Sequence, residues 1–89
     1  MIRIGYAPEF FRALKKLPKN IQEKTFACIK LFEDRKNHRA LEVHKLHGIY
    51  KGTLSFSVDF RYRIIFAWVS KHEVEFYTIG DHNIYRNKK

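Results

Sequence analysis

Cysteine is nearly absent from this chain, and so are long apolar runs. The single cysteine, Cys28, cannot form an internal disulfide, which favours a reducing compartment and excludes a cysteine-based metal finger. No segment approaches the roughly 18 consecutive apolar residues that a membrane-spanning helix needs. The first residues lack the apolar stretch of a signal peptide. We therefore expect a cytoplasmic protein that has no membrane among its partners.

Acidic residues are also scarce, since nine Asp and Glu stand against 18 Lys and Arg. The resulting net charge of +9 exceeds the roughly 2 to 8 charges that suffice to keep a small domain soluble. Summed positive charge attracts polyanions, so this surplus predicts nucleic acid or an acidic protein segment as a partner. Solubility alone is the plainer interpretation of the same charge.

Hydrophobic residues are abundant despite this charge, and they argue against disorder. The chain has 89 residues, which is room for one domain. We expect a single domain over residues 1–89, in which residues 86–89 form a flexible basic tail.

Two prolines and the spacing of apolar residues predict a pair of helices after a short strand. Residues 2–6 alternate between apolar and polar side chains, as in a strand. Pro8 and Pro18 each suit the first turn of a helix, where the missing N–H group costs nothing. The inward stripe of the second helix comprises Ile21, Thr25, Cys28, Ile29 and Phe32. We expect Cys28 to fill the core there.

Three strands are predicted in the second half of the chain, after an irregular stretch at 37–52. Residues 54–58 alternate, residues 62–69 are almost continuously apolar as in a central strand, and alternation returns at 74–79. Residues 59–61 form the turn between the first two of these strands. The order βααβββ predicts an α+β fold, in which the N-terminal strand and a helical hairpin pack on a mainly antiparallel four-stranded sheet.

Five histidines raise the possibility of a metal site. They are His38, His44, His47, His72 and His82. None has an Asp, Glu or Cys partner at a recognised ligand spacing, and no serine lies in a nucleophile-elbow motif. The sequence therefore predicts neither a metal nor another cofactor.

The second half of the chain does contain the groups that metal-free phosphodiester cleavage requires. That reaction needs a base for the ribose 2′-hydroxyl, cations for the negative phosphorane, and an acid for the leaving 5′-oxygen. Histidine can transfer the protons, arginine matches phosphate oxygens, and aromatic rings stack on bases. The candidates are His44, His47, Lys51, Arg61, Arg63, His82 and Tyr85.

Three short motifs carry a resemblance to a known family. They read His44-Lys-Leu-His-Gly-Ile-Tyr-Lys-Gly52, Tyr62-Arg-Ile-Ile-Phe66 and Thr78-Ile-Gly-Asp-His82-Asn-Ile-Tyr85. In this order and spacing the chain resembles the RelE/ParE superfamily of bacterial toxin–antitoxin toxins, on its RelE/YafQ-like side. The resemblance covers nearly the whole chain and implies a toxin that cuts mRNA in the ribosomal A site and is silenced by a cognate antitoxin.

The resemblance also implies a role for each matching residue. Arg63 matches the arginine that contacts the scissile phosphate, and Lys51 matches a lysine that stabilises charge. His82 falls at a catalytic histidine of YafQ-like toxins, and His44 falls at a proton-transfer histidine. Tyr85 approximates the aromatic residue that stacks on a base. We expect these five residues to be catalytic.

Further contacts to RNA are expected from His47, Lys45, Arg61 and Arg86. The chain departs from the family at two positions, because Ser57 and Arg61 stand where YafQ-like toxins have a histidine and an aspartate. The identity of the general base therefore stays open between His44, His47 and another group.

Each candidate also has a plainer interpretation. Arg63 could be a strand-edge arginine that pairs with Asp59 or Glu73. His82 could be a polar loop residue, and Lys51 could be an ordinary solvated lysine.

The sequence thus predicts a type II toxin that acts as a ribosome-dependent, metal-independent mRNA endoribonuclease. Its expected partners are mRNA, the ribosome and a cognate antitoxin whose acidic segment covers the basic groove. The first alternative is a ParE-like toxin that poisons gyrase without catalysis. The second is an inactive module that binds only RNA or an antitoxin.

Overall fold

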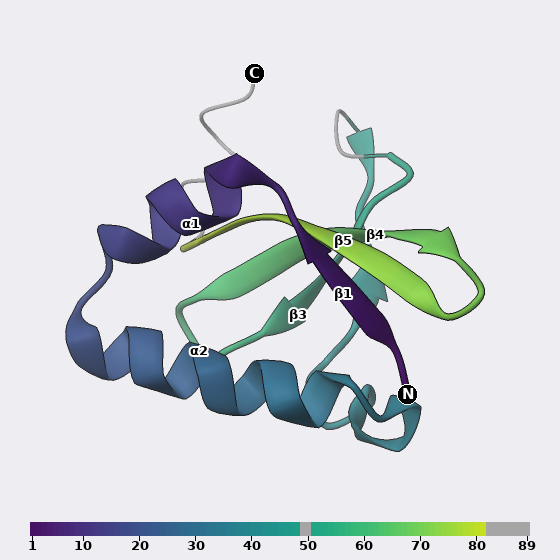
Figure 1. Cartoon of the computed structure of the whole chain (residues 1–89), viewed down its shortest axis with the longest axis horizontal. Coiled ribbons are helices and arrows are strands. Elements are labelled where there is room, and N and C mark those ends of the chain that lie inside the picture. Colours follow the sequence, from purple (N-terminus) through teal and green to yellow (C-terminus); the bar gives the residue numbers. More distant parts are fainter. Residues whose placement is uncertain (49–50, 82–89) are drawn as a thin grey trace.

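A computed structural model describes residues 1–48 and 51–81 of the chain (Figure 1). Its helices are α1 (Pro8–Lys15), α2 (Lys19–Phe32) and the short 3-10 helix η1 (Arg35–Asn37). Its strands are β1 (Arg3–Tyr6), β2 (His44–Lys45), β3 (Leu54–Ser57), β4 (Arg63–Ser70) and β5 (Glu73–Gly80). No helix in these two ranges is long and apolar enough to cross a membrane. The predicted tail at 86–89 lies outside the described residues.

The strands form one mixed sheet in the order β1-β5-β4-β3-β2. β1 pairs with β5 in parallel, while the other neighbours pair antiparallel. The predicted α+β class and the mainly antiparallel sheet are confirmed. The sheet has five strands where four were expected, because β2 lies in the stretch that was interpreted as irregular. A strand of two residues is too short to show the alternation that identifies a strand in a sequence.

Both prolines begin helices as predicted. Pro8 is the first residue of α1, and Pro18 caps the N-terminus of α2. On α2, Cys28 is buried and its thiol donates to the backbone oxygen of Val58 at 3.4 Å. Burial raises the pKa of this thiol, which keeps it protonated and unreactive. The structure confirms Cys28 as a core residue.

Phenylalanine rings form the centre of the core, where α1 and α2 meet the sheet. The fully buried rings are those of Phe10, Phe32, Phe56, Phe66 and Phe76. The ring of Phe32 on α2 lies 4.6 Å from that of Phe56 and 5.0 Å from that of Phe66, measured between centroids. Each such pair adds about 0.5–1.5 kcal/mol to the stabilisation from burial itself. Tyr62 and Trp68 are partly buried against this core.

The register of the strands gives the sheet a second, polar face. Successive residues of a strand point to opposite faces, and directly paired residues share a face. Phe56 points into the core, so its neighbour Ser57 points away from it, opposite Arg63 on β4. His44 on β2 lies opposite Ser55 and belongs to the same face as Ser57. Figure 1 shows the β2–β3 hairpin, in teal, extending on the side of the molecule away from α2.

Candidate functional site

Arg63 occupies the centre of the polar face and is almost completely enclosed. Its side chain is only 14% exposed. The Nε atom donates to Ser55 Oγ at 3.0 Å, Nη1 donates to Ser57 Oγ at 2.6 Å, and Nη2 donates to the backbone oxygen of Glu42 at 3.1 Å. Three of the five N–H groups of the guanidinium are therefore committed to acceptors within the protein. The fold holds this cation in one orientation.

His44 lies against this guanidinium, although 19 residues separate the two in the sequence. Its Nδ1 atom is 3.1 Å from Arg63 Nη2 and 3.0 Å from the backbone oxygen of Glu42. The imidazole is exposed, and no polar atom of residues 1–48 and 51–81 bonds its Nε2 atom. The structure thus brings together two of the predicted catalytic residues, one as a fixed cation and one as a group that can exchange a proton.

Glu42 and Ser57 complete the cluster. The Ser57 hydroxyl accepts from Arg63 Nη1 and donates to Glu42 Oε1 at 2.7 Å. The same carboxylate oxygen lies 3.7 Å from Arg63 Nη1. Arg63 therefore pairs with Glu42, and neither Asp59 nor Glu73 is its partner. Both of those acids are engaged elsewhere, Asp59 with the backbone of its own turn and Glu73 with Arg3 at 3.6 Å.

A second group of predicted residues lies in a pocket of the β2–β3 hairpin. The pocket has a volume of about 380 Å³ and is lined by Lys45, Leu46, His47, Lys51, Gly52, Thr53 and Leu54. Lys45 lies opposite Leu54, so it points to the face opposite that of its neighbour His44. Gly48 and Gly52 have φ angles of 69° and 93°, which a residue with a side chain rarely adopts. The predicted residues are thus divided between a polar face and a hairpin pocket.

The turn between β3 and β4 positions a further predicted residue, Arg61, apart from both of these groups. Asp59 Oδ1 accepts from the backbone N–H groups of Arg61 at 2.8 Å and Tyr62 at 2.7 Å, which is the turn the sequence predicts. The guanidinium of Arg61 lies 5.5 Å from the centre of the Tyr62 ring and 3.7 Å from Asp81. Phe60 at the tip of the turn is 94% exposed. Arg61 thus stands beside the last described residue of the chain.

His82, Tyr85 and Arg86 lie outside the described residues. Asp81 immediately precedes them and follows β5, whose last residue, Gly80, pairs with Arg63. The last residue of β5 therefore lies next to Arg63, two positions before His82 in the sequence.

Solved structures of other proteins share this architecture. No protein-family model and no curated protein sequence matches the chain. YafQ from Escherichia coli superposes with a TM-score of 0.77 and 17% sequence identity, over 96% of this chain and 98% of that one. The E. coli DinJ–YafQ toxin–antitoxin complex gives a TM-score of 0.70 at 19% identity, over 93% and 94% of the two chains. The RelBE2 toxin–antitoxin complex from Mycobacterium tuberculosis gives 0.66 at 19%, over 91% and 98%.

The chain has the RelE/YafQ fold. The family resemblance drawn from the three motifs is confirmed at the level of the fold, over nearly the full length of both chains. In this fold, the polar face with Arg63 and His44 is formed where β2, β3 and β4 pair.

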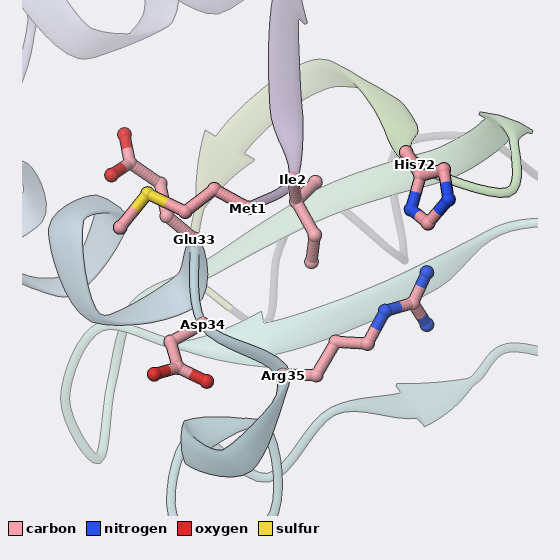
Figure 2. A pocket seen from close by; sticks show the side chains of 6 residues that line it. All are labelled: Met1, Ile2, Glu33, Asp34, Arg35 and His72. Carbon is pink, nitrogen blue, oxygen red and sulfur yellow. The ribbon is translucent and has the colours of Figure 1, made fainter.

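A separate pocket lies at the far end of β4 in this RelE/YafQ fold. It has a volume of about 340 Å³, and its lining comprises Met1, Ile2, Glu33, Asp34, Arg35 and His72. Figure 2 shows the Arg35 and His72 side chains near the same gap beside Ile2, while Glu33 and Asp34 lie on the other side. Arg35 is already used within the protein, since it lies 4.5 Å from the centre of the Trp68 ring and donates to the backbone oxygen of Lys71. None of the predicted site residues within residues 1–48 and 51–81 lines this pocket.

Glu42 is the functional candidate that sequence reasoning missed. It precedes β2 in the stretch interpreted as irregular, and no motif contains it. Its position in the cluster depends on the pairing of β2 with β3 and of β3 with β4. The only signal in the sequence is an acidic residue in a strongly basic stretch.

Proposed function

We propose that the chain is the toxin of a type II toxin–antitoxin pair and that it cleaves ribosome-bound mRNA without a metal. The contact between His44 and Arg63, at 3.1 Å on the polar face of a RelE/YafQ fold, is the observation that carries this proposal. A histidine whose Nε2 is exposed, and whose Nδ1 can donate to the Glu42 carbonyl beside a fixed cation, suits acid–base chemistry at a phosphate. We assign the activity to the cytoplasm, where translating ribosomes are found.

The proposed reaction is an internal transfer at the phosphodiester. His44 takes the proton of the ribose 2′-hydroxyl on Nε2, and the 2′-oxygen attacks phosphorus. The bond from phosphorus to the 5′-oxygen breaks, and that oxygen receives a proton from an acid, for which His82 is the candidate. The products are a 2′,3′-cyclic phosphate and a 5′-hydroxyl, so no water, metal or redox partner enters the balance.

The cations in this proposal have different tasks. Arg63 supplies a fixed positive charge beside the reacting phosphate, because three of its N–H groups already bond within the protein. Lys51 is exposed and lies in the hairpin pocket with Lys45 and His47, so it is free to follow the phosphate backbone. Arg61 extends the positive charge toward the end of β5. Tyr85 and Arg86 complete the proposal as the stacking residue and a further RNA contact.

The decisive experiment is cleavage of mRNA on purified translating ribosomes. Wild-type protein is expected to cut the mRNA and leave a 2′,3′-cyclic phosphate, while His44→Ala is expected to cut it about 10²–10⁴-fold more slowly. Intact mRNA together with gyrase-dependent DNA breaks would favour the ParE-like alternative. Intact mRNA and intact DNA, with the protein still bound to RNA or an antitoxin, would favour the inactive module.

The proposal includes an antitoxin with an acidic segment over the polar face. The chain carries a net charge of +9, and complementary charge speeds association. The solved DinJ–YafQ and RelBE2 structures are toxin–antitoxin complexes of proteins with this fold. We expect an acidic partner encoded beside this gene to co-purify with the protein at moderate salt. A complex in which the partner leaves Arg63 and the hairpin uncovered would contradict inhibition by occlusion.

A further inference from the structure

We propose that Glu42 is the positioning residue of this site, and that it fixes the proton on His44 and the orientation of Arg63. The inference rests on the cleavage function proposed above and assigns a role that neither the motifs nor the resemblance contains. It is carried by two independent features of Glu42, namely its backbone conformation and the contacts of its carboxylate.

The backbone of Glu42 adopts the left-handed conformation, with φ at 59°. Among the described residues it is the only one other than glycine with a positive φ. A residue with a Cβ atom adopts this conformation only where its surroundings impose it, and such residues gather at functional sites. Backbone hydrogen bonds of the two neighbouring residues hold this conformation. Ser57 N donates to Leu41 O at 2.8 Å, and Val43 N donates to His38 O at 3.0 Å. The chain is thus held on both sides of Glu42.

This conformation directs the Glu42 carbonyl at two groups of the site. Arg63 Nη2 donates to it at 3.1 Å, and His44 Nδ1 lies 3.0 Å from it. The carbonyl can only accept, and arginine can only donate. The proton on His44 Nδ1 is therefore the one variable in this group of three polar atoms.

The two tautomers of His44 have opposite consequences. If Nδ1 carries the proton, it donates to the Glu42 carbonyl and leaves the exposed Nε2 with a lone pair, which is the form of a general base. In this form Nδ1 cannot accept from Arg63, so Nδ1 and Nη2, which lie 3.1 Å apart, both donate to the same carbonyl. If Nδ1 is bare, it accepts from Arg63, its lone pair faces that of the carbonyl, and Nε2 can only donate. A backbone carbonyl bonded to Nδ1 commonly selects the first tautomer. The carbonyl of Glu42 is placed to make this selection.

The Glu42 carboxylate acts on Arg63 through a hydroxyl. Arg63 Nη1 donates to Ser57 Oγ at 2.6 Å, and Ser57 Oγ donates to Glu42 Oε1 at 2.7 Å. The direct pair between Arg63 Nη1 and Oε1, at 3.7 Å with the carboxylate 70% exposed, is worth little by itself. The hydroxyl has one proton, so donating it to Glu42 turns the oxygen lone pairs toward Arg63. Without the carboxylate the hydroxyl is free to rotate, and Arg63 loses a fixed acceptor.

Two substitutions separate the backbone feature from the carboxylate. Glu42→Gly removes the side chain and the steric cost of a positive φ, whereas Glu42→Ala keeps the Cβ atom that disfavours this φ, as in glutamate, and loses the carboxylate contacts that help to hold it. Glu42→Gln keeps the shape and removes the charge. Glu23→Gln, an exposed glutamate on α2, is the matched control. Thermal unfolding of each variant, monitored by circular dichroism, identifies a temperature at which all of them are folded.

The first measurement is the tautomer of His44 in the isolated protein, read from the nitrogen chemical shifts of its imidazole. We expect the proton on Nδ1 in wild type, in Glu42→Gly and in Glu23→Gln. We expect Glu42→Ala to shift the population toward the Nε2-protonated form. Wild-type protein with the proton on Nε2 would overturn the inference, whether or not the protein cleaves RNA.

The second measurement is single-turnover cleavage of ribosome-bound mRNA. Glu42→Gln and Glu42→Gly are expected to lower the maximal rate about 10-fold with half-saturation unchanged, and Glu42→Ala is expected to lower it about 100-fold, the loss that misplacement of a reacting group typically causes. Wild-type rates in all three variants would overturn the role of Glu42 and leave the proposed function standing. No cleavage by wild type, together with the expected tautomers, would overturn the proposed function and leave the positioning of His44 by Glu42 standing.

Discussion

Replacing Arg63 is expected to lower both the free energy of unfolding and the rate of cleavage. Arg63 donates three hydrogen bonds at 2.6 to 3.1 Å from a side chain that is 14% exposed. Ser55, one of its acceptors, is fully buried. Arg63→Ala leaves these acceptors without their donor. Arg63→Lys retains the charge, but a single ammonium group cannot reach three acceptors that lie around a planar fork.

The expected magnitudes follow from these contacts. A hydrogen bond to a charged group contributes about 1.5–3 kcal/mol, and an unsatisfied buried group costs about 1–3 kcal/mol. Removing the arginine also removes the cost of desolvating its charge, so the net loss is smaller than the sum of the three bonds. We therefore expect Arg63→Ala to lower the free energy of unfolding by about 2–4 kcal/mol. The melting temperature should then fall by roughly 10 to 20 °C, since each kcal/mol shifts it by about 4–8 °C in a domain of this size. Arg63→Lys should lose about half as much.

The assay combines thermal unfolding with single-turnover cleavage at a temperature where every variant is folded. Arg63→Ala should slow cleavage about 10²–10³-fold, as loss of one electrostatic donor typically does. Arg63→Lys should remain at least about 10-fold slower than wild type, because the charge is present but unfixed. If Arg63→Lys cleaves at the wild-type rate, charge alone suffices and the fixed orientation seen here has no catalytic role. If Arg63→Ala unfolds like wild type, the three bonds are not stabilising and the structural argument is wrong.

Three further predictions test other parts of the site and core. His44→Ala should slow cleavage about 10²–10⁴-fold, whereas His72→Ala, at the far end of β4, should leave the rate within about 2-fold of wild type. Cleavage should persist in EDTA-treated protein that is resupplied only with the magnesium that ribosomes need, and a requirement for a transition metal would refute the metal-free mechanism. His82→Ala should lower turnover about 10²–10⁴-fold with binding retained, and wild-type turnover in this variant would refute the assignment of His82. Burial raises the pKa of Cys28, so the folded state holds the thiol proton more tightly and the free energy of unfolding should fall as the pH rises above the pKa of about 8.5 in the unfolded chain. Urea titrations at increasing pH would show this fall in wild type, and an equal fall in Cys28→Ala would contradict it.

The sequence was sufficient to predict the helices and strands that are indicated by residues within the element itself. Pro8 and Pro18 mark helix starts through their own backbone chemistry, and both helices begin there. β4 and β5 were predicted because eight-residue strands are long enough to show a pattern. β2 was missed because its two residues show none. Its existence depends on the register of β3, which pairs with it.

The candidate site was predicted only in part, for a related reason. Motifs identify residue types at positions along the chain, so they selected His44, Lys51 and Arg63. They do not show that His44 and its neighbour Lys45 point to opposite faces of a short strand, which divides the predicted set between the polar face and the hairpin pocket. Glu42 was missed because its role depends on a positive φ and on a contact across three strands.

The division of the cations has a consequence for how this site can bind RNA. Arg63 is enclosed and has most of its donors committed, so it cannot also clamp a phosphate as a free fork. In the proposed function, contacts to the RNA backbone are then left to exposed cations, namely Lys45 and Lys51 in the hairpin pocket and Arg61 in the turn. Contacts of such exposed cations weaken steeply with salt, whereas the enclosed contacts of Arg63 do not. Binding of RNA by this chain should therefore depend on ionic strength far more than the rate of cleavage once RNA is bound.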